Sequence, residues 1–105
     1  MTVETVAFEP ERYLQTQEAQ EHFLTEAIES GNARYITHAL GVVARARGMS
    51  ELARDTGLNR QALYAAFSEG GNPRFETVLK LLGALGLEMK IAPRGTAEAD
   101  HTTAR

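Results

Sequence analysis

Short segments with helical spacing of apolar residues, most of them followed by a glycine, restrict this chain to a small bundle of helices. Glycine tolerates the left-handed backbone that ends a helix, so Gly31, Gly48, Gly57 and Gly86 each mark a helix end. Side-chain oxygens just before the apolar periods are suited to cap the first turn. The pattern predicts an all-α fold of about five helices, at about 17–30, 32–48, 50–56, 60–67 and 75–85, with Thr16, Asn32 and Asn59 as N-caps.

The stretch after the last helix has a different period. Leu87, Met89 and Ile91 alternate with Glu88 and Lys90, which is typical of a short, half-buried β-strand. A single strand leaves its backbone N–H and C=O groups without partners. We therefore expect this strand to pair across a two-fold dimer, with the three apolar residues at the dimer interface.

The two ends of the chain differ from the middle in their pattern of apolar residues. Residues 2–8 alternate loosely before Pro10 and predict an extended or irregular stretch, which could add as an edge strand to another molecule. Residues from Arg94 onward have no apolar period and predict disorder. The expected organisation is an acidic N-terminal segment with one helix at 1–31, a helical domain at 32–92 that includes the C-terminal strand, and a disordered tail at 93–105.

Composition limits the class of protein further. A chain of 105 residues without cysteine fits one compact core, has no disulfide or thiolate zinc site, and suits a reducing compartment. The N-terminus lacks the basic and apolar regions of a signal peptide, and no apolar run approaches the length of about 20 residues that a membrane span needs. We expect a cytoplasmic protein.

Charge is distributed unevenly along the chain. The net charge is −3, yet residues 1–31 hold seven acids against one arginine, whereas residues 32–94 hold nine bases against five acids. Acids on the predicted first helix usually serve solubility. An acidic arm on a basic body, however, predicts two partners of different charge. The expected binding residues for a basic protein are Glu18, Glu21, Glu26 and Glu29.

The run from Met49 to Tyr64 carries the most functional information. Ala53 gives a small helix contact, Gly57 a tight turn, and Leu58 with Leu63 holds the second helix against the first. Such a pair exposes the start of its second helix, which fits the major groove of DNA. Arginine can bind guanine through two hydrogen bonds, and glutamine can bind adenine in the same way. The expected base contacts are Arg60, Gln61 and Tyr64.

This run resembles the helix-turn-helix of the Xre/Cro-repressor superfamily. The longer stretch "ALGVVARARGMSELARDTGLNRQALYAAFSEGGNPRFETVLKLLGALGLEMKI", together with "YLQTQEAQEHFLTEAIESGN", resembles HigA-like addiction-module antidote proteins over about residues 8–91. The resemblance implies an antitoxin of a type II toxin–antitoxin pair. Such an antitoxin neutralises a RelE/ParE-like toxin and represses its own operon as a homodimer. It also implies DNA contacts at Ser50, Asn59, Arg60, Gln61, Tyr64 and Arg74.

Three features weaken that expectation. Many repressors of the superfamily have glutamine where this chain has Met49 and Ser50, which weakens the phosphate contact expected at Ser50. Arg74 fits a phosphate contact and a solvated turn equally well. The overall acidity also leaves open an interaction module whose helix-turn-helix no longer binds DNA. A stand-alone transcriptional repressor is a further alternative, although the chain leaves no room for an effector domain.

Catalysis and metal binding have no support in the sequence. The three histidines, His22, His38 and His101, have no paired spacing for a metal or for acid–base chemistry. The run 70–73 lacks the strand and the Lys-Ser/Thr pair of a phosphate-binding loop. We therefore expect a non-enzymatic protein without a metal or cofactor.

Overall fold

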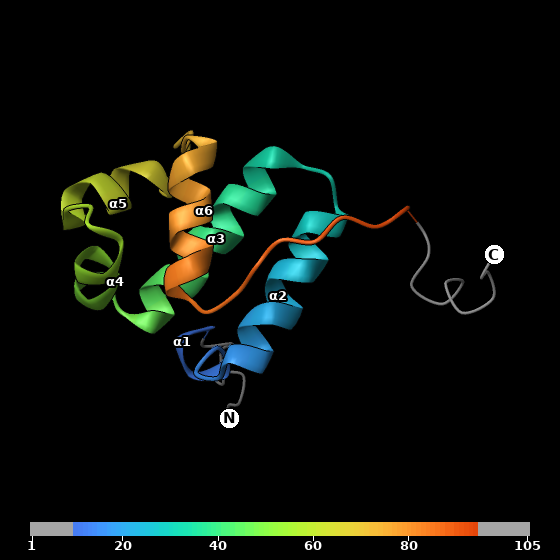
Figure 1. Cartoon of the computed structure of the whole chain (residues 1–105), viewed down its shortest axis with the longest axis horizontal. Coiled ribbons are helices and arrows are strands. Elements are labelled where there is room, and N and C mark those ends of the chain that lie inside the picture. Colours follow the sequence, from blue (N-terminus) through green and yellow to red (C-terminus); the bar gives the residue numbers. More distant parts are fainter. Residues whose placement is uncertain (1–9, 95–105) are drawn as a thin grey trace, which may run out of the picture.

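The computed structural model describes residues 10–94, and these residues form six α-helices. Figure 1 shows α4 and α5 at one end of the molecule, α2 at the other end, and α3 and α6 between them. No helix of the described part is long and apolar enough to cross a membrane. The helices are α1 (Pro10–Tyr13), α2 (Gln17–Glu29), α3 (Ala33–Arg47), α4 (Met49–Thr56), α5 (Arg60–Ala66) and α6 (Phe75–Ala84).

The predicted helix ends agree with the structure because the capping signals are local. Thr16, Asn32 and Asn59 have extended backbones, and each accepts a hydrogen bond from the backbone N–H three residues later. Gly57 takes the left-handed conformation expected of a helix stop, with φ +80°. The five helices expected from the sequence are all present, within one or two residues at each end.

The helix α1 (Pro10–Tyr13) was not predicted. The sequence pattern predicts that Pro10 interrupts an extended stretch. In the structure Pro10 instead occupies the first position of a helix, where the backbone N–H has no intrahelical partner and its absence loses no hydrogen bond. The turn after α1 buries Leu14, whose carbonyl oxygen accepts a hydrogen bond from the buried Gln20 side chain. The edge strand expected at residues 2–8 lies outside the described residues, as does the tail at 95–105.

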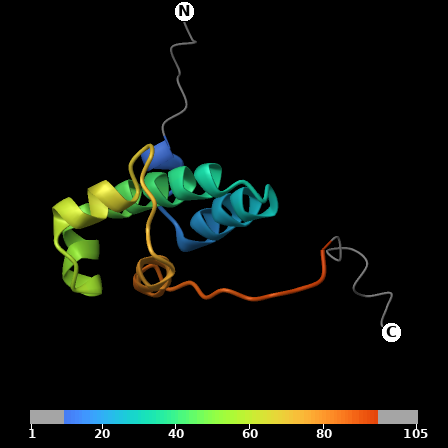
Figure 2. The same cartoon turned by 90° about the horizontal axis from the view of Figure 1, so that it is seen from above.

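One apolar cluster joins the helices. Leu24 and Ala27 of α2 pack with Val43 of α3, and the same cluster contains Leu63 of α5 and Leu81 of α6. Figure 2 shows α3 alongside α2 in the view from above. The acidic helix therefore shares a core with the helices that follow it. The fully buried large side chains are Leu14, Val43, Leu52, Leu63, Phe67, Leu81 and Leu85.

The buried face of α6 is rotated from the one expected. The helical spacing of Phe75, Val78, Leu79, Leu82 and Leu85 in the sequence predicts that they share the buried face. The side chains of Phe75 and Leu79, however, are 64% and 45% exposed. Leu81 takes a core position instead, next to Leu82. Helical spacing alone did not separate these faces, because apolar residues cover more than half of the circumference of α6. In α5, the apolar spacing of Ala62, Leu63 and Ala66 or Phe67 predicts that they face inward, but Ala62 is exposed.

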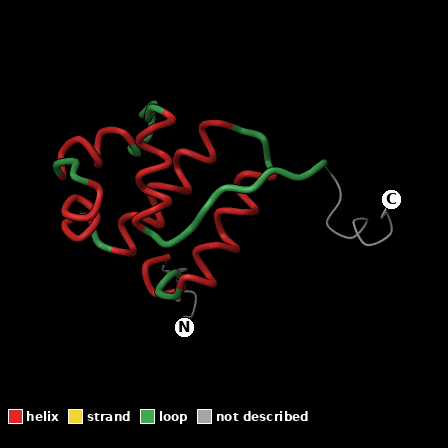
Figure 3. Tube along the Cα trace, in the orientation of Figure 1, coloured by secondary structure: helices red, strands yellow, loops and turns green. Residues whose placement is uncertain are grey.

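Residues 87–93 form no β-strand among the described residues (Figure 3). The expected strand is therefore not present within the single chain. The physical reason is the lack of a neighbour, since the rest of the described chain is helical and offers no strand edge to pair with. Pairing across a dimer stays a prediction.

Polar side chains hold the start of this segment in place. The Gln17 side-chain amide donates to the carbonyl oxygens of Leu85, at 2.9 Å, and Gly86, at 3.3 Å. The Arg47 guanidinium donates to the carbonyl oxygen of Ala84 at 3.2 Å. These bonds satisfy carbonyl groups at the end of α6, and they fix where the segment leaves the core.

Candidate functional site

The turn between α4 and α5 is tight and internally hydrogen-bonded. The Gly57 N–H donates to the Ala53 carbonyl oxygen at 3.0 Å. The Thr56 hydroxyl donates to the Leu52 carbonyl oxygen at 2.7 Å and accepts from the Leu58 N–H at 3.2 Å. The sequence predicted the roles of Gly57 and Leu58, whereas the bridging role of Thr56 was missed. These contacts fix the direction in which α5 begins.

The start of α5 is formed by Asn59 and held by the core. The Asn59 side-chain oxygen accepts a hydrogen bond from the Ala62 N–H at 2.7 Å, so this oxygen is already engaged in capping the helix. On the inner face, Leu63 and Phe67 are fully buried. Because α5 is anchored along this face, its opposite face points to solvent.

The exposed face of α5 carries the residues expected to read bases. Arg60 and Gln61 are exposed, and Tyr64 is 41% exposed. The Arg60 guanidinium carbon lies 5.8 Å from the centre of the Tyr64 ring, which is within cation–π range. Arg60 makes no ion pair with any described residue. Its charge is therefore held near the helix surface without being neutralised by a carboxylate.

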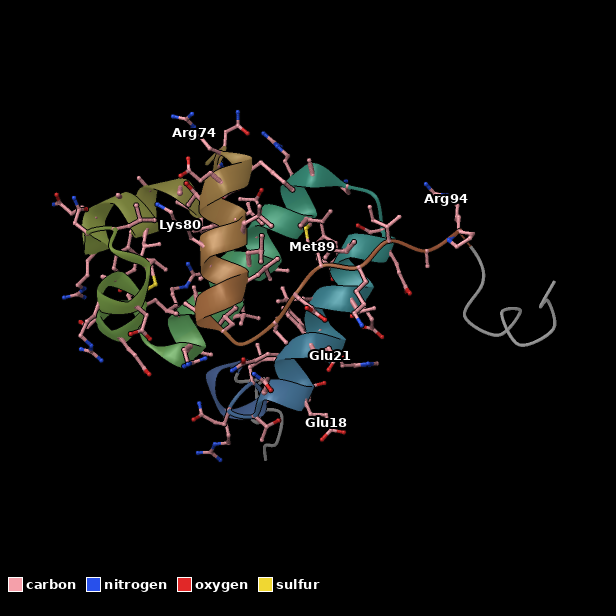
Figure 4. All side chains as sticks on the ribbon, viewed as in Figure 1. Glu18, Glu21, Arg74, Lys80, Met89 and Arg94 are labelled. Atoms are coloured by element: carbon pink, nitrogen blue, oxygen red, sulfur yellow. The ribbon has the colours of Figure 1, made fainter. Side chains whose placement is uncertain are left out.

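The other two predicted DNA contacts lie at the starts of neighbouring helices. Ser50 is exposed in the first turn of α4, and no side chain caps that helix. Arg74 is exposed at the N-cap position of α6 and makes no capping bond there (Figure 4). Uncapped N–H groups and a cation favour an anionic partner at these positions. The structure thus places the predicted contacts at the starts of three helices, α4, α5 and α6.

A second polar face lies on α2, at the other end of the molecule. All four predicted acids on this helix are exposed, and α2 contains no lysine or arginine. Glu26 lies 3.3 Å from the imidazole of His22, whereas Glu18 and Glu21 point outward in Figure 4. The fold therefore separates the acidic helix α2 from α5, the helix that carries Arg60 and no acid.

A groove of about 1030 Å³ lies between α2 and the segment after α6. Its apolar lining includes Leu24 and Ile28 from α2, and Leu87 and Met89 from the segment. It brings together two of the predicted acids, Glu21 and Glu29, and two of the predicted dimer residues, Leu87 and Met89. Glu18, Glu26 and Ile91 do not line it.

The three predicted dimer residues differ in exposure. Leu87 packs against the core, and its N–H donates to the Leu82 carbonyl oxygen at 2.8 Å. Met89 is 46% exposed and Ile91 is 99% exposed. Exposed apolar side chains on an extended segment are typical of a surface that a partner covers.

The comparisons with known proteins identify a family for the chain. The family described as "Probable addiction module antidote protein" matches residues 4–93. An uncharacterized protein of Haemophilus influenzae is 41% identical over 91 residues, which is 87% of this chain and 94% of that protein. No solved structure matches the chain. The chain therefore belongs to the family of probable addiction-module antidote proteins, and an antidote implies a toxin as its partner.

Proposed function

We propose that this protein is the antitoxin of a type II toxin–antitoxin module, which neutralises a RelE/ParE-like toxin and represses its own operon as a cytoplasmic homodimer. The observation that carries the DNA-binding part is the exposed start of α5, with Arg60, Gln61 and Tyr64 projecting from a helix fixed by Leu63 and Phe67. The likeness to the Xre/Cro helix-turn-helix supports the same interpretation.

The proposed DNA contacts divide into two kinds. Arg60 and Gln61 would read base edges in the major groove, where each two-point contact discriminates between bases by about 1–3 kcal/mol. Ser50 and Arg74, at the starts of α4 and α6, would contact phosphates and fix the register on the duplex. Stacking on Tyr64 holds Arg60 near the helix before DNA arrives, which lowers the entropy lost on binding.

The small size of the base-contacting surface on α5 implies a dimer. One short helix contacts too few base pairs for tight, specific binding. Two copies placed about 34–36 Å apart would read the two halves of a palindrome. The segment with Leu87, Met89 and Ile91 is the proposed interface, because it is extended, apolar on alternate positions and without a strand partner in the described chain.

The acidic face of α2 is the proposed toxin-binding surface. Its four glutamates are exposed and α2 has no cation, so it favours a basic partner such as a ribonuclease of the RelE/ParE type. Antidote-family membership supports a toxin as that partner. On the groove side of α2, Leu24 and Ile28 add apolar area next to Glu21 and Glu29, which suits a basic segment with apolar anchors.

A band-shift titration tests the DNA-binding part. The purified protein is titrated against the DNA upstream of its own gene, at two salt concentrations and with unrelated competitor DNA present. We expect a specific complex that weakens steeply as salt rises, because phosphate contacts release counterions. Absence of a complex at low salt, from a folded dimer, would favour the alternative suggested by the net charge of −3, an interaction module that binds only protein.

Co-expression with the neighbouring toxin gene tests the second part. We expect the antitoxin to restore growth and to co-purify with the toxin. Growth arrest that persists, with both proteins present and no complex between them, would contradict the proposed neutralisation.

A further inference from the structure

The segment after α6 exposes backbone groups and apolar side chains that a neighbouring strand would cover. Among the described residues, the backbone N–H and C=O groups of 88–92 make no hydrogen bond to another part of the chain. Ile91 is 99% exposed, although isoleucine is among the side chains most often buried and Leu87, in the same segment, packs against the core. Both observations indicate a missing strand neighbour.

We propose that residues 87–91 pair antiparallel with the same residues of a second copy, in the register that puts Met89 on the two-fold axis. The inference rests on the dimer of the proposed function and deepens it by fixing the register. In this register Met89 faces its own copy, Leu87 faces Ile91 of the second copy, and Glu88 faces Lys90 of that copy.

Charge selects this register over its neighbours. Side chains directly opposite each other on an antiparallel pair interact, and like charges there are unfavourable. Moving the axis to residue 88 would oppose two glutamates, and moving it to residue 90 would oppose two lysines. The Met89 register instead gives two Glu–Lys pairs by symmetry. Within the single chain the two side chains are already close, with Lys90 Nζ 3.5 Å from Glu88 Oε2, and both are about four-fifths exposed, at 81% and 76%.

Three other arrangements fit less well. Moving the axis to Ile91 would place Pro93 opposite Met89, and proline has no N–H for the ladder. A parallel in-register pair would oppose identical charges at residues 88 and 90. A shift by one residue would set charged side chains against apolar ones. The Met89 register also brings the exposed Ile91 of one copy next to the core-packed Leu87 of the other, which explains why Ile91 is bare in a single chain.

Disulfide cross-linking tests the register, because the chain has no cysteine of its own. We expect Met89→Cys to form a covalent dimer rapidly under mild oxidation, since residue 89 faces its own copy. Ile91→Cys is the matched control: in this register its two copies lie four residues apart along the strand, about 13 Å, which is beyond disulfide reach. Efficient cross-linking of Ile91→Cys without cross-linking of Met89→Cys would overturn the proposal.

A charge exchange provides the second test, measured as the dimer dissociation constant by sedimentation. Glu88→Lys and Lys90→Glu each place like charges opposite each other twice, and each should weaken the dimer about tenfold. The combined variant restores opposite charges and should return to within about twofold of the original. The two single variants change the net charge in opposite directions, so a shared weakening cannot come from net charge. A combined variant as weak as the singles would overturn the register.

The failure of this inference is distinguishable from that of the proposed function. If the unmodified protein is a dimer that binds operator DNA, but the cross-linking or charge exchange fails, the register is wrong and the antitoxin–repressor function stands. If the unmodified protein sediments as a monomer and binds no operator, both the register and the proposed DNA-binding function are wrong.

Discussion

The outer faces of α2 and α5 lie at opposite ends of the same small protein and differ in almost every property that matters for binding (Figure 1). The face of α2 is acidic and contains no lysine or arginine, whereas that of α5 carries an arginine stacked on a tyrosine and no acid. Both helices nevertheless anchor in one apolar cluster, through Leu24 and Leu63. The net charge of the chain is therefore a poor guide to its partners, because the fold separates the two charges.

The largest expected effect is on DNA binding by the α5 face. Replacing Arg60 and Gln61 together with alanine should weaken operator binding about a thousandfold, because two base contacts of about 1–3 kcal/mol each are lost. Anisotropy titration with labelled operator measures this loss. Both residues are exposed, so circular dichroism and toxin binding should not change.

The matched control for that variant is Arg94→Ala, which removes the same single positive charge at a site far from α5 in Figure 4. It should change operator affinity less than about threefold, as expected for a surface charge away from the interface. Equal losses in the two variants would show that bulk charge, rather than α5, governs binding.

The second effect concerns the α2 face. Glu21→Gln with Glu29→Gln neutralises the two acids that line the groove, and should weaken toxin binding about tenfold, mainly through the association rate. The control, Glu69→Gln with Glu76→Gln, makes the same charge change elsewhere on the surface. Surface plasmon resonance against the toxin compares the two. Identical affinities of the two variants would remove α2 from the toxin interface.

The third effect tests the core on which both faces depend. A Cβ atom on Gly41 of α3 would overlap the Phe67 carbonyl oxygen at the end of α5. Gly41→Ala should therefore lower the free energy of unfolding by about 2 kcal/mol, through overpacking against backbone. At Gly83 of α6 a Cβ would meet no atom within 4 Å, so Gly83→Ala should raise stability by about 0.5–1 kcal/mol. Urea unfolding measures both, and equal effects at the two sites would contradict the close approach of α3 and α5.

The smallest effect is on the cap of α5. Asn59→Ala removes the hydrogen bond to the Ala62 N–H and should cost about 1 kcal/mol of stability. Asn59→Ser keeps a capping oxygen and should cost a few tenths of that value. A stability loss in Asn59→Ser as large as that in Asn59→Ala, by thermal unfolding, would show that capping is not the role of this side chain.

Features set by neighbouring residues could be predicted from the sequence, and features set by distant ones could not. The caps at Asn32 and Asn59 and the left-handed Gly57 depend on three or four adjacent residues, and they were confirmed. The contact of Gly41 with Phe67 joins residues far apart in the chain, and no local sequence pattern indicates it. The bonds from Gln17 to the end of α6 span 68 and 69 residues and were missed for the same reason.

The candidate site divides in the same way. Exposure of Arg60, Gln61 and Tyr64 followed from the periodicity of one helix, since Leu63 must face inward. The stacking of Arg60 on Tyr64 is a contact between residues four apart, and helical spacing permits it without specifying it. The alternation at residues 87–91 predicts a strand, but the described residues form none there, because a strand needs a neighbour and the rest of the described chain is helical.

The most direct test of the account adds the toxin to a preformed complex of the protein with its operator, and follows the mobility of the labelled DNA. If α5 binds DNA while α2 binds the toxin, the band should shift further and contain all three components. Release of free DNA as the toxin is added would show that the two partners compete for one surface, and would contradict the separation of the two faces.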